Sequence, residues 1–474
     1  MNNFCKSICC CNKKRNYNKN SNPINNDLSE NLAHSHNEKH NHKININRQN
    51  EISKTKEDKS YTNSSGSSLV SIKIMINGQN NNFNEQTKNI NIKKHSIEFE
   101  KLKIIGRGSF GITYLVKVIK IKEDKETKLD SELVYLMPYF AMKVISKNFI
   151  KKHNYKQNIM NERLILEKIN HPFILSLYYA YQDNEKLFLV TEFIQGGELY
   201  FHLKKQKTFT ESLILIYAAE IFLAIEHLHK KKIIYRDLKL ENVMIDKQGH
   251  IKIIDFGLAK LNSYVSNNND ENNKGYDHEG YDNDSMSVRA DSMVGTIHYI
   301  APEILAGEVY NKSVDWWSFG ILLYEMLIGV VPFQIDKSQV ANNFDKNVLD
   351  IKNIKFDIKD NRRNSNTTLL LDNIIDLIHK LLIIDPNKRI NADGIRSHKL
   401  FSKINWNEVL NKELKPSFIP KINSDIDLSN FESTIVEDLS ENDDNLLLFR
   451  NQNEYEDVDN YLNYSYVNKQ FFYR

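Results

Sequence analysis

The sequence lacks four features that would each define a class of protein. Its four cysteines all lie within the first eleven of 474 residues, so the body of the chain has no disulfide framework, as expected in a reducing compartment. No run of eighteen apolar residues occurs, which argues against a transmembrane helix, and the N-terminus lacks the apolar stretch of a secretory signal. The net charge is only +3, so bulk charge does not indicate a nucleic-acid partner.

Residues 1–95 contain few large apolar side chains and many Asn, Lys, Ser and His. Such a segment cannot bury enough surface to offset the entropy lost on ordering, so we predict that it is largely disordered. A histidine cluster in this segment would resemble a metal site if it lay on a folded scaffold. In a polar tract, a solvated histidine-rich run is the favoured interpretation. The cluster consists of His34, His36, His40 and His42.

The N-terminal cysteines are followed directly by the basic run 13–15. Clustered thiols beside cations favour reversible S-acylation, which would hold the protein at anionic membranes. Asn2 excludes N-myristoylation, because that modification needs glycine. Exposed free thiols and a small metal site stay open as alternatives, although the spacing does not suit a closed zinc site. We expect a cytoplasmic protein that associates peripherally with membranes through Cys5, Cys9, Cys10 and Cys11.

The polar residues with the clearest chemistry lie in residues 235–242 and in Asp255-Phe256-Gly257. Asp237 can orient a hydroxyl, Lys239 can neutralise a phosphate, and Asn242 with Asp255 can supply the oxygen ligands that Mg²⁺ prefers. Apolar runs around these residues predict a short hairpin that presents them from the loops at its ends. A solvated charged loop is the alternative, but it does not explain the whole series at these spacings.

Gly106-Arg107-Gly108-Ser109-Phe110-Gly111 is a G-x-G-x-x-G motif, which by itself is weak evidence. In a dinucleotide-binding fold this motif would open a helix and be followed by an acidic residue about twenty positions on. Residues 112–118 instead alternate between apolar and polar side chains, as a strand does. The motif therefore predicts a glycine-rich hairpin whose backbone amides approach phosphates closely.

Lys143 lies within the β-rich run 141–145, where a lysine is costly unless it has an anionic partner. Glu162 lies in residues 158–166, whose apolar positions repeat at helical spacing. An ion pair between these two residues would hold the ammonium against nucleotide phosphates. Either residue alone could be an ordinary surface charge, but together with the glycine loop they indicate a nucleotide site.

These motifs, together with Ala301-Pro302-Glu303, resemble those of a eukaryotic protein kinase. Most kinases have His at the position of Tyr235, and a tyrosine there resembles the AGC group. Within this group, Leu240 and the motif at 315–320 resemble those of protein kinase B. The ribosomal-protein kinase branch fits the whole sequence about equally well. The resemblance implies an α+β, bilobal kinase fold, with a β-rich small lobe (99–194) and an α-helical large lobe (195–401) in a kinase domain at 99–401. An AGC C-terminal tail at 402–474 would follow.

The resemblance also implies that ATP and Mg²⁺ are the cofactors. Asp237 would accept the hydrogen bond of the substrate hydroxyl, Lys239 would steady the γ-phosphoryl group, and Asn242 and Asp255 would hold Mg²⁺. Thr191 falls at the gatekeeper position, and the backbone of residues 192–194 would read the adenine edge. The implied nucleotide site comprises Ile105, Gly106, Arg107, Gly108, Ser109, Phe110, Gly111, Thr113, Ala141, Lys143, Glu162, Thr191, Glu192, Ile194, Glu198, Met244 and Phe431.

Four residues match positions that recognise the protein substrate. Thr296 matches the residue that contacts the catalytic Asp in serine/threonine-specific kinases, and Glu198, Glu241 and Glu325 match positions that bind arginines upstream of the acceptor. The resemblance therefore implies a serine/threonine kinase of intracellular signalling that prefers Arg three residues before the acceptor. Its other expected partner is an upstream activating kinase. We expect a monomer and no nucleic-acid partner.

Two serines match regulatory phosphosites of AGC kinases. Ser292 follows a long Asn- and Asp-rich insertion at 266–285, and its phosphate would pair with Arg236. Residues 461–466 resemble the hydrophobic motif, with tyrosines where phenylalanines are usual, and contain Ser465. Two aromatic residues spaced by three would dock on the small lobe and press on the helix that carries Glu162. An unmodified serine in a loop and a disordered aromatic tail are the alternatives.

Asn158 occupies a position where relatives often have His, so the link from the activation-loop phosphate to this helix is expected to be weaker. Glu303 is expected to pair with Arg389 as a structural ion pair. An ATP-binding scaffold without turnover, located at membranes, stays open as a second class of function, although every group needed for phosphate transfer is present.

Overall fold

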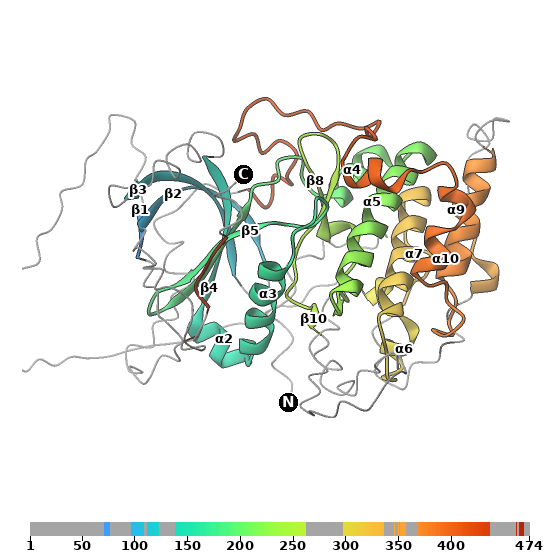
Figure 1. Ribbon diagram of the computed structural model, residues 1–474, viewed down its shortest axis with the longest axis horizontal. Coiled ribbons are helices and arrows are strands. Elements are labelled where there is room, and N and C mark those ends of the chain that lie inside the picture. The colour runs from blue at the N-terminus through green and yellow to red at the C-terminus, as the bar shows by residue number, and fades with distance from the viewer. Residues whose placement is uncertain are drawn as a thin grey trace, which may run out of the picture. The chain divides into compact units, whose positions relative to one another are not determined.

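The computed structural model describes residues 71–75, 96–108, 111–122, 138–261, 297–335, 346, 349, 351–356, 368–436, 461 and 464–468. All of them belong to one unit of the chain, Leu69–Arg474. Figure 1 shows a strand-rich region with α2 and α3 beside it and a region of packed helices. The predicted α+β, bilobal fold is therefore confirmed. The cysteine and histidine clusters, Ser109, Phe110, the insertion at 266–285, Ser292 and Thr296 lie outside the described residues.

The small lobe is built on a seven-stranded sheet with the order β1-β2-β3-β4-β6-β5-β11. Every neighbouring pair in this sheet is antiparallel. The core on one face includes Phe99, Phe140 and Tyr179, whose rings meet edge to face. The strands are β1 (Ser71–Met75), β2 (Ser96–Arg107), β3 (Ile112–Lys122), β4 (Tyr139–Ser146), β5 (Leu177–Gln182), β6 (Lys186–Glu192) and β11 (Tyr466–Val467).

Two helices accompany this sheet, α2 (Lys147–His153) and α3 (Lys156–Lys168). Ser146 caps α2, because its hydroxyl accepts a hydrogen bond from the backbone N–H of Phe149. Asn154 ends α2 in the left-handed conformation, with φ of 57°. This short connection brings α3, which carries Glu162, against the sheet.

Ser71–Met75 are an ordered stretch within the segment that the sequence predicts to be largely disordered. These residues form β1, which pairs antiparallel with the first half of β2. A five-residue edge strand has little stability of its own, so its formation depends on β2, which lies twenty residues further along the chain. Local composition around β1 is rich in Asn and therefore does not predict a strand that forms by pairing with β2.

The large lobe is organised around α5, which is capped by the hydroxyl of Thr210 and buried along nearly its whole length. The predicted buried helix at 212–230 is confirmed. This helix is long and apolar enough to cross a membrane, but 72% of its apolar window is buried inside the lobe, as in a core helix. The helices are α4 (Leu199–Gln206), α5 (Glu211–Lys230), α6 (Pro302–Leu305), α7 (Ser313–Ile328), α9 (Thr368–Leu381), α10 (Ala392–Arg396) and α11 (Trp406–Leu410).

Two small antiparallel ladders lie between these helices and the sheet. Strand β8 (Val243–Ile245) pairs with β9 (Ile251–Ile253), which is the predicted hairpin. Strand β7 (Ile233–Ile234) pairs instead with β10 (Lys260–Leu261). Both candidate catalytic stretches therefore lie in loops whose two ends are each fixed by a strand.

Glu303 and Arg389 form the predicted ion pair. Arg389 Nη1 lies 2.7 Å from Glu303 Oε1 and Nη2 lies 3.0 Å from Oε2, and neither side chain is exposed. Arg389 also donates to the carbonyl of Ser313 at the start of α7. The pair therefore ties the segment that begins α6 to the start of α7 and to the loop that follows α9.

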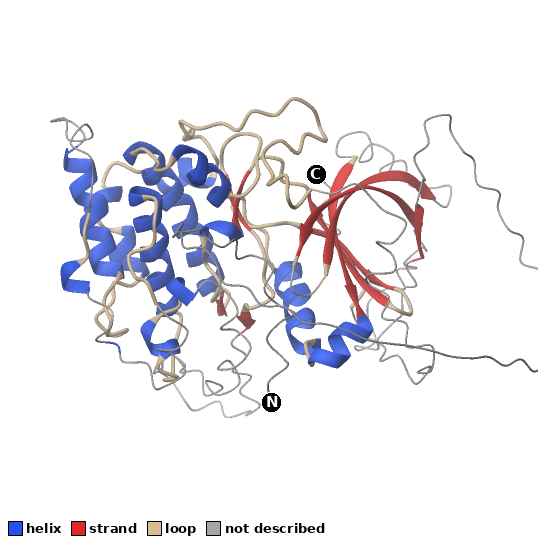
Figure 2. Cartoon of the chain, turned by 180° about the vertical axis from the view of Figure 1, so that it is seen from behind, coloured by secondary structure: helices blue, strands red, loops and turns tan. Residues whose placement is uncertain are grey.

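After α11 the chain continues as an extended segment, drawn as a loop in Figure 2. Gln195 donates to the carbonyl of Ser424 over 2.9 Å, and Lys204 pairs with Glu432 at 2.7 Å. The ring of Phe431 stacks on that of Phe193, with 6.1 Å between centroids. These contacts place the tail beside the connection between β6 and α4.

Candidate active site

The loop that carries Asp237 is held in a strained conformation by Asp315. Arg236 has a φ of 67°, in the left-handed region that non-glycine residues rarely adopt. The buried carboxylate of Asp315 on α7 accepts hydrogen bonds from the backbone N–H of Tyr235 (2.9 Å) and of Arg236 (2.7 Å). His229 Nε2 lies 2.7 Å from the same carboxylate. The large-lobe core thus fixes the backbone immediately before Asp237.

Asp237, Lys239 and Asn242 form one hydrogen-bonded group. Lys239 Nζ lies 2.9 Å from Asp237 Oδ2, and Asn242 Nδ2 donates to the same oxygen over 2.7 Å. Burial raises the pKa of Asp237, although the charge of Lys239 opposes this effect. Burial would lower the pKa of Lys239, but the charge of Asp237 outweighs it and raises the pKa. The sequence-predicted catalytic residues therefore lie together, and the charges of Asp237 and Lys239 stabilise each other.

Lys143 and Glu162 form the ion pair that the sequence predicts. Lys143 Nζ lies 2.7 Å from Glu162 Oε1 and 3.1 Å from Oε2. Asp255 Oδ1 lies 4.0 Å from the same ammonium. Burial would lower the pKa of Lys143, but the charges of Glu162 and Asp255 outweigh it, so the pKa is raised and the side chain stays cationic. Residues from β4, α3 and the loop after β9 thus meet at one point.

Asp255 has the properties of a ligand for a hard cation. Its side chain is 44% exposed, in contrast to that of Glu162 beside it. Although burial would raise the pKa of Asp255, the charge of Lys143 and the N–H of Gly257 hold the pKa below its ordinary value. Asn242 is linked to the same loop, because its carbonyl accepts from Ile254 N over 2.9 Å. An ionised carboxylate and an amide on joined loops suit Mg²⁺.

Tyr235 supports the loop that carries Asp255. Its hydroxyl donates a short hydrogen bond to the carbonyl of Ile254, the residue before Asp255. Its buried ring meets that of Phe256 edge to face, with 5.2 Å between centroids. The position that signals the kinase group in the sequence is thus a structural support for Asp255.

The glycine motif forms a hairpin between β2 and β3, as predicted, and does not open a helix. Gly108 N donates to Gly111 O over 2.9 Å, which closes the turn. A Cβ at Gly111 would lie 2.1 Å from the carbonyl oxygen of Val144, so no larger residue fits there. Thr113 lies opposite Lys143 in the β3–β4 ladder. The hairpin is therefore in register with the strand that carries the nucleotide-site lysine.

The predicted gatekeeper and hinge follow on β6. Thr191 lies opposite Ala141, and its hydroxyl donates to the carbonyl of Ala141 over 3.4 Å. Glu192 is the last residue of β6, and the next residue, Phe193, stacks on Phe431 of the tail. Met244 on β8 is linked to Glu198 by an isolated β-bridge. The predicted gatekeeper and hinge therefore lie next to the strand that carries Lys143, and the tail contacts the hinge through Phe431.

Glu198, Glu241 and Glu325 form an electrostatically unfavourable group. Burial is the main cause that raises the pKa of Glu198 and of Glu325, each to about 7, and Glu241 adds to the effect on both. Burial also raises the pKa of Glu241. One oxygen of Glu241 is buried and has no hydrogen-bond partner among the described residues. A cation bound beside this group would lower these pKa values.

The tail docks on the small lobe where the sequence predicts. Tyr461 and Tyr464 are buried, and Gln182 donates to the carbonyl of Tyr461 over 2.8 Å. Strand β11 adds to the edge of the sheet by pairing with β5. Arg163 on α3 donates to the carbonyl of Ser465 over 3.4 Å, whereas the side chain of Ser465 is exposed. The tail thus contacts α3 one residue after Glu162.

Sequence reasoning missed several contacts that position these residues. Asn158 Nδ2 donates to the carbonyl of Gly257 over 3.2 Å, a direct link from α3 to the Asp-Phe-Gly loop. Arg236 donates to the carbonyl of Leu258 and to the hydroxyl of Tyr310, both over 2.7 Å. No local pattern predicts contacts between segments so far apart in the chain. The role of Asp315 could have been suspected from a lone carboxylate between apolar residues.

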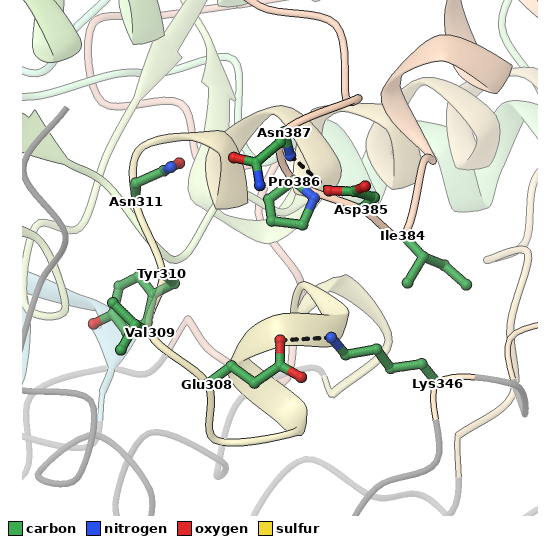
Figure 3. A pocket seen from close by; sticks show the side chains of 9 residues that line it. All are labelled: Glu308, Val309, Tyr310, Asn311, Lys346, Ile384, Asp385, Pro386 and Asn387. Atoms are coloured by element: carbon green, nitrogen blue, oxygen red, sulfur yellow. Dashed lines mark hydrogen bonds and ion pairs between the residues drawn. The ribbon is translucent and has the colours of Figure 1, made fainter. Parts of the chain in front are cut away.

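A pocket of about 490 Å³ lies away from the catalytic residues, around the segment between α6 and α7 and the loop after α9. Figure 3 shows the ion pair of Glu308 with Lys346 on one side of it and Pro386 on the other. Tyr310, which accepts from Arg236, also lines this pocket. None of the sequence-predicted site residues is among its lining residues.

The geometry defines a protein kinase domain, and comparison with known proteins agrees. The protein kinase domain family matches residues 99–401, so the chain belongs to this family. It is 36% identical to the RAC family serine/threonine-protein kinase homolog of Dictyostelium discoideum over 342 residues, 72% of this chain and 66% of the relative.

Two other relatives are similar to the same degree. The cAMP-dependent protein kinase catalytic subunit of Dictyostelium discoideum is 36% identical over 74% of this chain and 47% of its own length. The serine/threonine-protein kinase AtPK1/AtPK6 of Arabidopsis thaliana is 36% identical over 71% of this chain and 62% of its own length. Within the protein kinase family, these relatives identify the AGC group. The matched segments span less than two thirds of the length of these relatives.

Proposed function

We propose that this protein is an ATP-dependent serine/threonine protein kinase of intracellular signalling. The observation that carries the proposal is the convergence of Lys143, Glu162 and Asp255, with Lys143 Nζ at 2.7 Å from Glu162 and 4.0 Å from Asp255. Asp237 and Lys239 supply the groups needed at the transferring phosphate. The similarity to named serine/threonine kinases supports the same activity.

The proposed chemistry assigns one task to each residue. Lys143, held by Glu162, binds the nucleotide phosphates, and Asp237 accepts the hydrogen bond of the substrate hydroxyl that attacks the γ-phosphorus while ADP leaves. Lys239 neutralises the transferring group, and Asn242 with Asp255 binds Mg²⁺. When bound, Mg²⁺ neutralises charge on the β- and γ-phosphates. Charge clamping and positioning provide most of the rate enhancement.

We propose that the protein substrates carry Arg three residues before the acceptor Ser or Thr. Support comes from Glu198 and Glu325, whose pKa values are raised to about 7 mainly by burial and further by the charge of Glu241. A guanidinium placed between them would form charge-assisted hydrogen bonds and restore full ionisation. A peptide library that showed acidic or proline preference would overturn this assignment.

We propose two regulatory phosphosites. Phosphate at Ser292, added by an upstream kinase, would order the activation segment through Arg236. Phosphate at Ser465 would strengthen docking of the tail on α3. The carbonyl of Ser465 already accepts a hydrogen bond from Arg163, which follows Glu162 on this helix. A Ser292→Ala protein with full activity would refute the first switch.

We further propose that the protein is cytoplasmic and reaches membranes by S-acylation of its N-terminal cysteines. The cysteine cluster and the basic run that follows it are the support. Replacement of Cys9, Cys10 and Cys11 by Ser should release the protein from the membrane fraction. Identical fractionation of mutant and wild type would refute the proposal.

A radiometric assay on protein phosphorylated at Ser292, with an arginine-containing peptide and Mg-ATP, tests the proposed activity. Wild-type protein should transfer phosphate, and Asp237→Asn should lose nearly all transfer while it still binds ATP. The other class of function, an ATP-binding scaffold, predicts equal ATP binding by both proteins and transfer by neither. The assay therefore separates the two classes directly.

A further inference from the structure

A buried ion pair joins the hinge to the strand that leads to Asp255. Lys252 Nζ on β9 lies 2.7 Å from Glu192 Oε1 at the end of β6, and both side chains are largely buried. The same Glu192 oxygen accepts a hydrogen bond from the backbone N–H of Ser176 over 2.8 Å. Lys252 Nζ also lies 3.3 Å from the carbonyl of Ile174. Three segments therefore meet at one pair of charges.

Backbone hydrogen bonds continue this junction toward the catalytic residues. Ile253 N donates to Phe173 O over 2.9 Å, and Leu175 N donates to Ile253 O over 3.0 Å. Residues 173–175 thus behave as an additional short strand on β9. Asp255 follows two residues after Ile253. Lys252 and Asp255 are therefore three residues apart on a segment that hydrogen bonds hold against residues 173–175.

The side chain of Glu192 is not available to a nucleotide. The sequence resemblance assigns Glu192 to the nucleotide site through its backbone, and its carboxylate is engaged by Ser176 and Lys252. Its backbone N–H donates to Ser176 O over 3.1 Å, so the residue is bonded to Ser176 in both directions. The carboxylate of Glu192 consequently binds Ser176 and Lys252 of the protein itself.

We propose that Glu192 and Lys252 are positioning residues that fix the hinge against β9 and thereby place Asp255 for phosphate transfer. This inference rests on the proposed kinase activity. A pair that positions Asp255 should affect the rate of transfer more than the binding of ATP. The adenine would still meet the backbone of residues 192–194, which stays anchored because Glu192 remains paired with Phe140 in the β4–β6 ladder.

The test is a double-mutant cycle with Glu192→Gln and Lys252→Met, in full-length protein phosphorylated at Ser292. Each single variant should lower kcat about tenfold, because small misplacements of catalytic groups cost rates of this size or more. The KM for ATP should stay within about twofold. The double variant should lose about as much as one single variant, because both remove the same interaction. Lys252→Arg, which keeps the charge, should recover most of the rate.

Arg396→Met is the matched control. It breaks another ion pair between separate elements, Arg396 Nε to Glu226 Oε1 at 3.1 Å, which joins α10 to α5 far from Asp255 along the chain. It should lower the melting temperature and leave kcat unchanged. Melting temperatures of all variants identify any protein that does not fold, and Glu192→Gln, which keeps shape and size, is the milder probe.

Several results would overturn the proposal. These are unchanged kcat in both single variants, additive losses in the double variant, no recovery with Lys252→Arg, or a loss of kcat in Arg396→Met equal to that in Lys252→Met. A raised KM for ATP with unchanged kcat would assign the pair to nucleotide binding instead. If wild-type protein transfers no phosphate, the proposed function itself is wrong, an outcome distinct from active wild type with unaffected variants.

Discussion

Arg163 donates a hydrogen bond to the backbone carbonyl of Ser465, a residue 302 positions further along the chain. Arg163 follows Glu162 on α3, and consecutive helical residues point in different directions. Glu162 therefore contacts Lys143 on one side of the helix while Arg163 contacts the tail on another. Docking of the tail and formation of the ion pair at the nucleotide site consequently constrain the same turn of α3.

Tyr464→Phe should strengthen docking of the tail. The side chain of Tyr464 is 0% exposed, and its hydroxyl has no hydrogen-bond partner among the described residues. A buried unsatisfied hydroxyl costs about 1–3 kcal/mol, so its removal should stabilise the docked state by about 1 kcal/mol. Hydrogen exchange of α3 and of β5 should slow in the variant, and the melting temperature should rise.

Tyr464→Ala is the control for this prediction, because it removes the ring as well as the hydroxyl. It should release the tail and accelerate exchange in the same segments. Faster exchange in Tyr464→Phe than in wild type would show that the hydroxyl has a partner that stabilises docking. The prediction would then be wrong.

Sequence motifs predicted which polar residues lie together, because these residues are close neighbours in the sequence. Asp237, Lys239 and Asn242 lie within six consecutive residues of one loop. Lys143 lies in a strand, where a buried lysine needs an anionic partner. The junction of Glu192 with Lys252 gave no such signal, because the two residues are 60 positions apart and each looks like a surface charge. Asn158 illustrates the same limit, since its contact with Gly257 depends on how α3 packs. Contacts of this kind follow from the assembled fold.

Glu198→Gln should stabilise the protein at alkaline pH. Burial, followed by the charges of Glu241 and Glu432, raises the pKa of Glu198 from 4.5 to about 7. The folded state therefore holds this proton more tightly than the unfolded state, and the associated stability is present below pH 4.5 and lost as pH rises through 7. Glutamine imitates the protonated form. The melting temperature of the variant should exceed that of wild type at pH 8, by more than at pH 5.

The same substitution should weaken the arginine site. The KM for a peptide with Arg three residues before the acceptor should rise about tenfold or more at pH 8, because a charge-assisted hydrogen bond is lost. The KM for the same peptide with Ala in place of that Arg provides the control and should not change. A stability gain that is equal at pH 5 and pH 8 would contradict the elevated pKa of Glu198.

Arg389→Met should destabilise the large lobe by about 3–5 kcal/mol, because it leaves the carboxylate of Glu303 buried without its cation. Urea unfolding measures this loss. The double variant Glu303→Gln with Arg389→Met should recover part of it, since no unpaired charge remains. Lys388→Met is the neighbouring control. Its side chain is 78% exposed, so its ion pair with Asp385 should contribute nothing measurable. Equal losses at both positions would refute the role of burial.

Thr191→Met should confer resistance to inhibitors that place a bulky group behind the adenine. Thr191 is 9% exposed and lies opposite Ala141, which the resemblance places beside the adenine. A longer methionine at this position would occupy the space that such a group needs. Inhibitor affinity should fall about 100-fold, whereas the KM for ATP should stay within about twofold, because the adenine contacts come from the hinge backbone. A matched compound without the bulky group should inhibit both proteins equally. Equal potency of the bulky compound against the variant would show that Thr191 does not control access to this space.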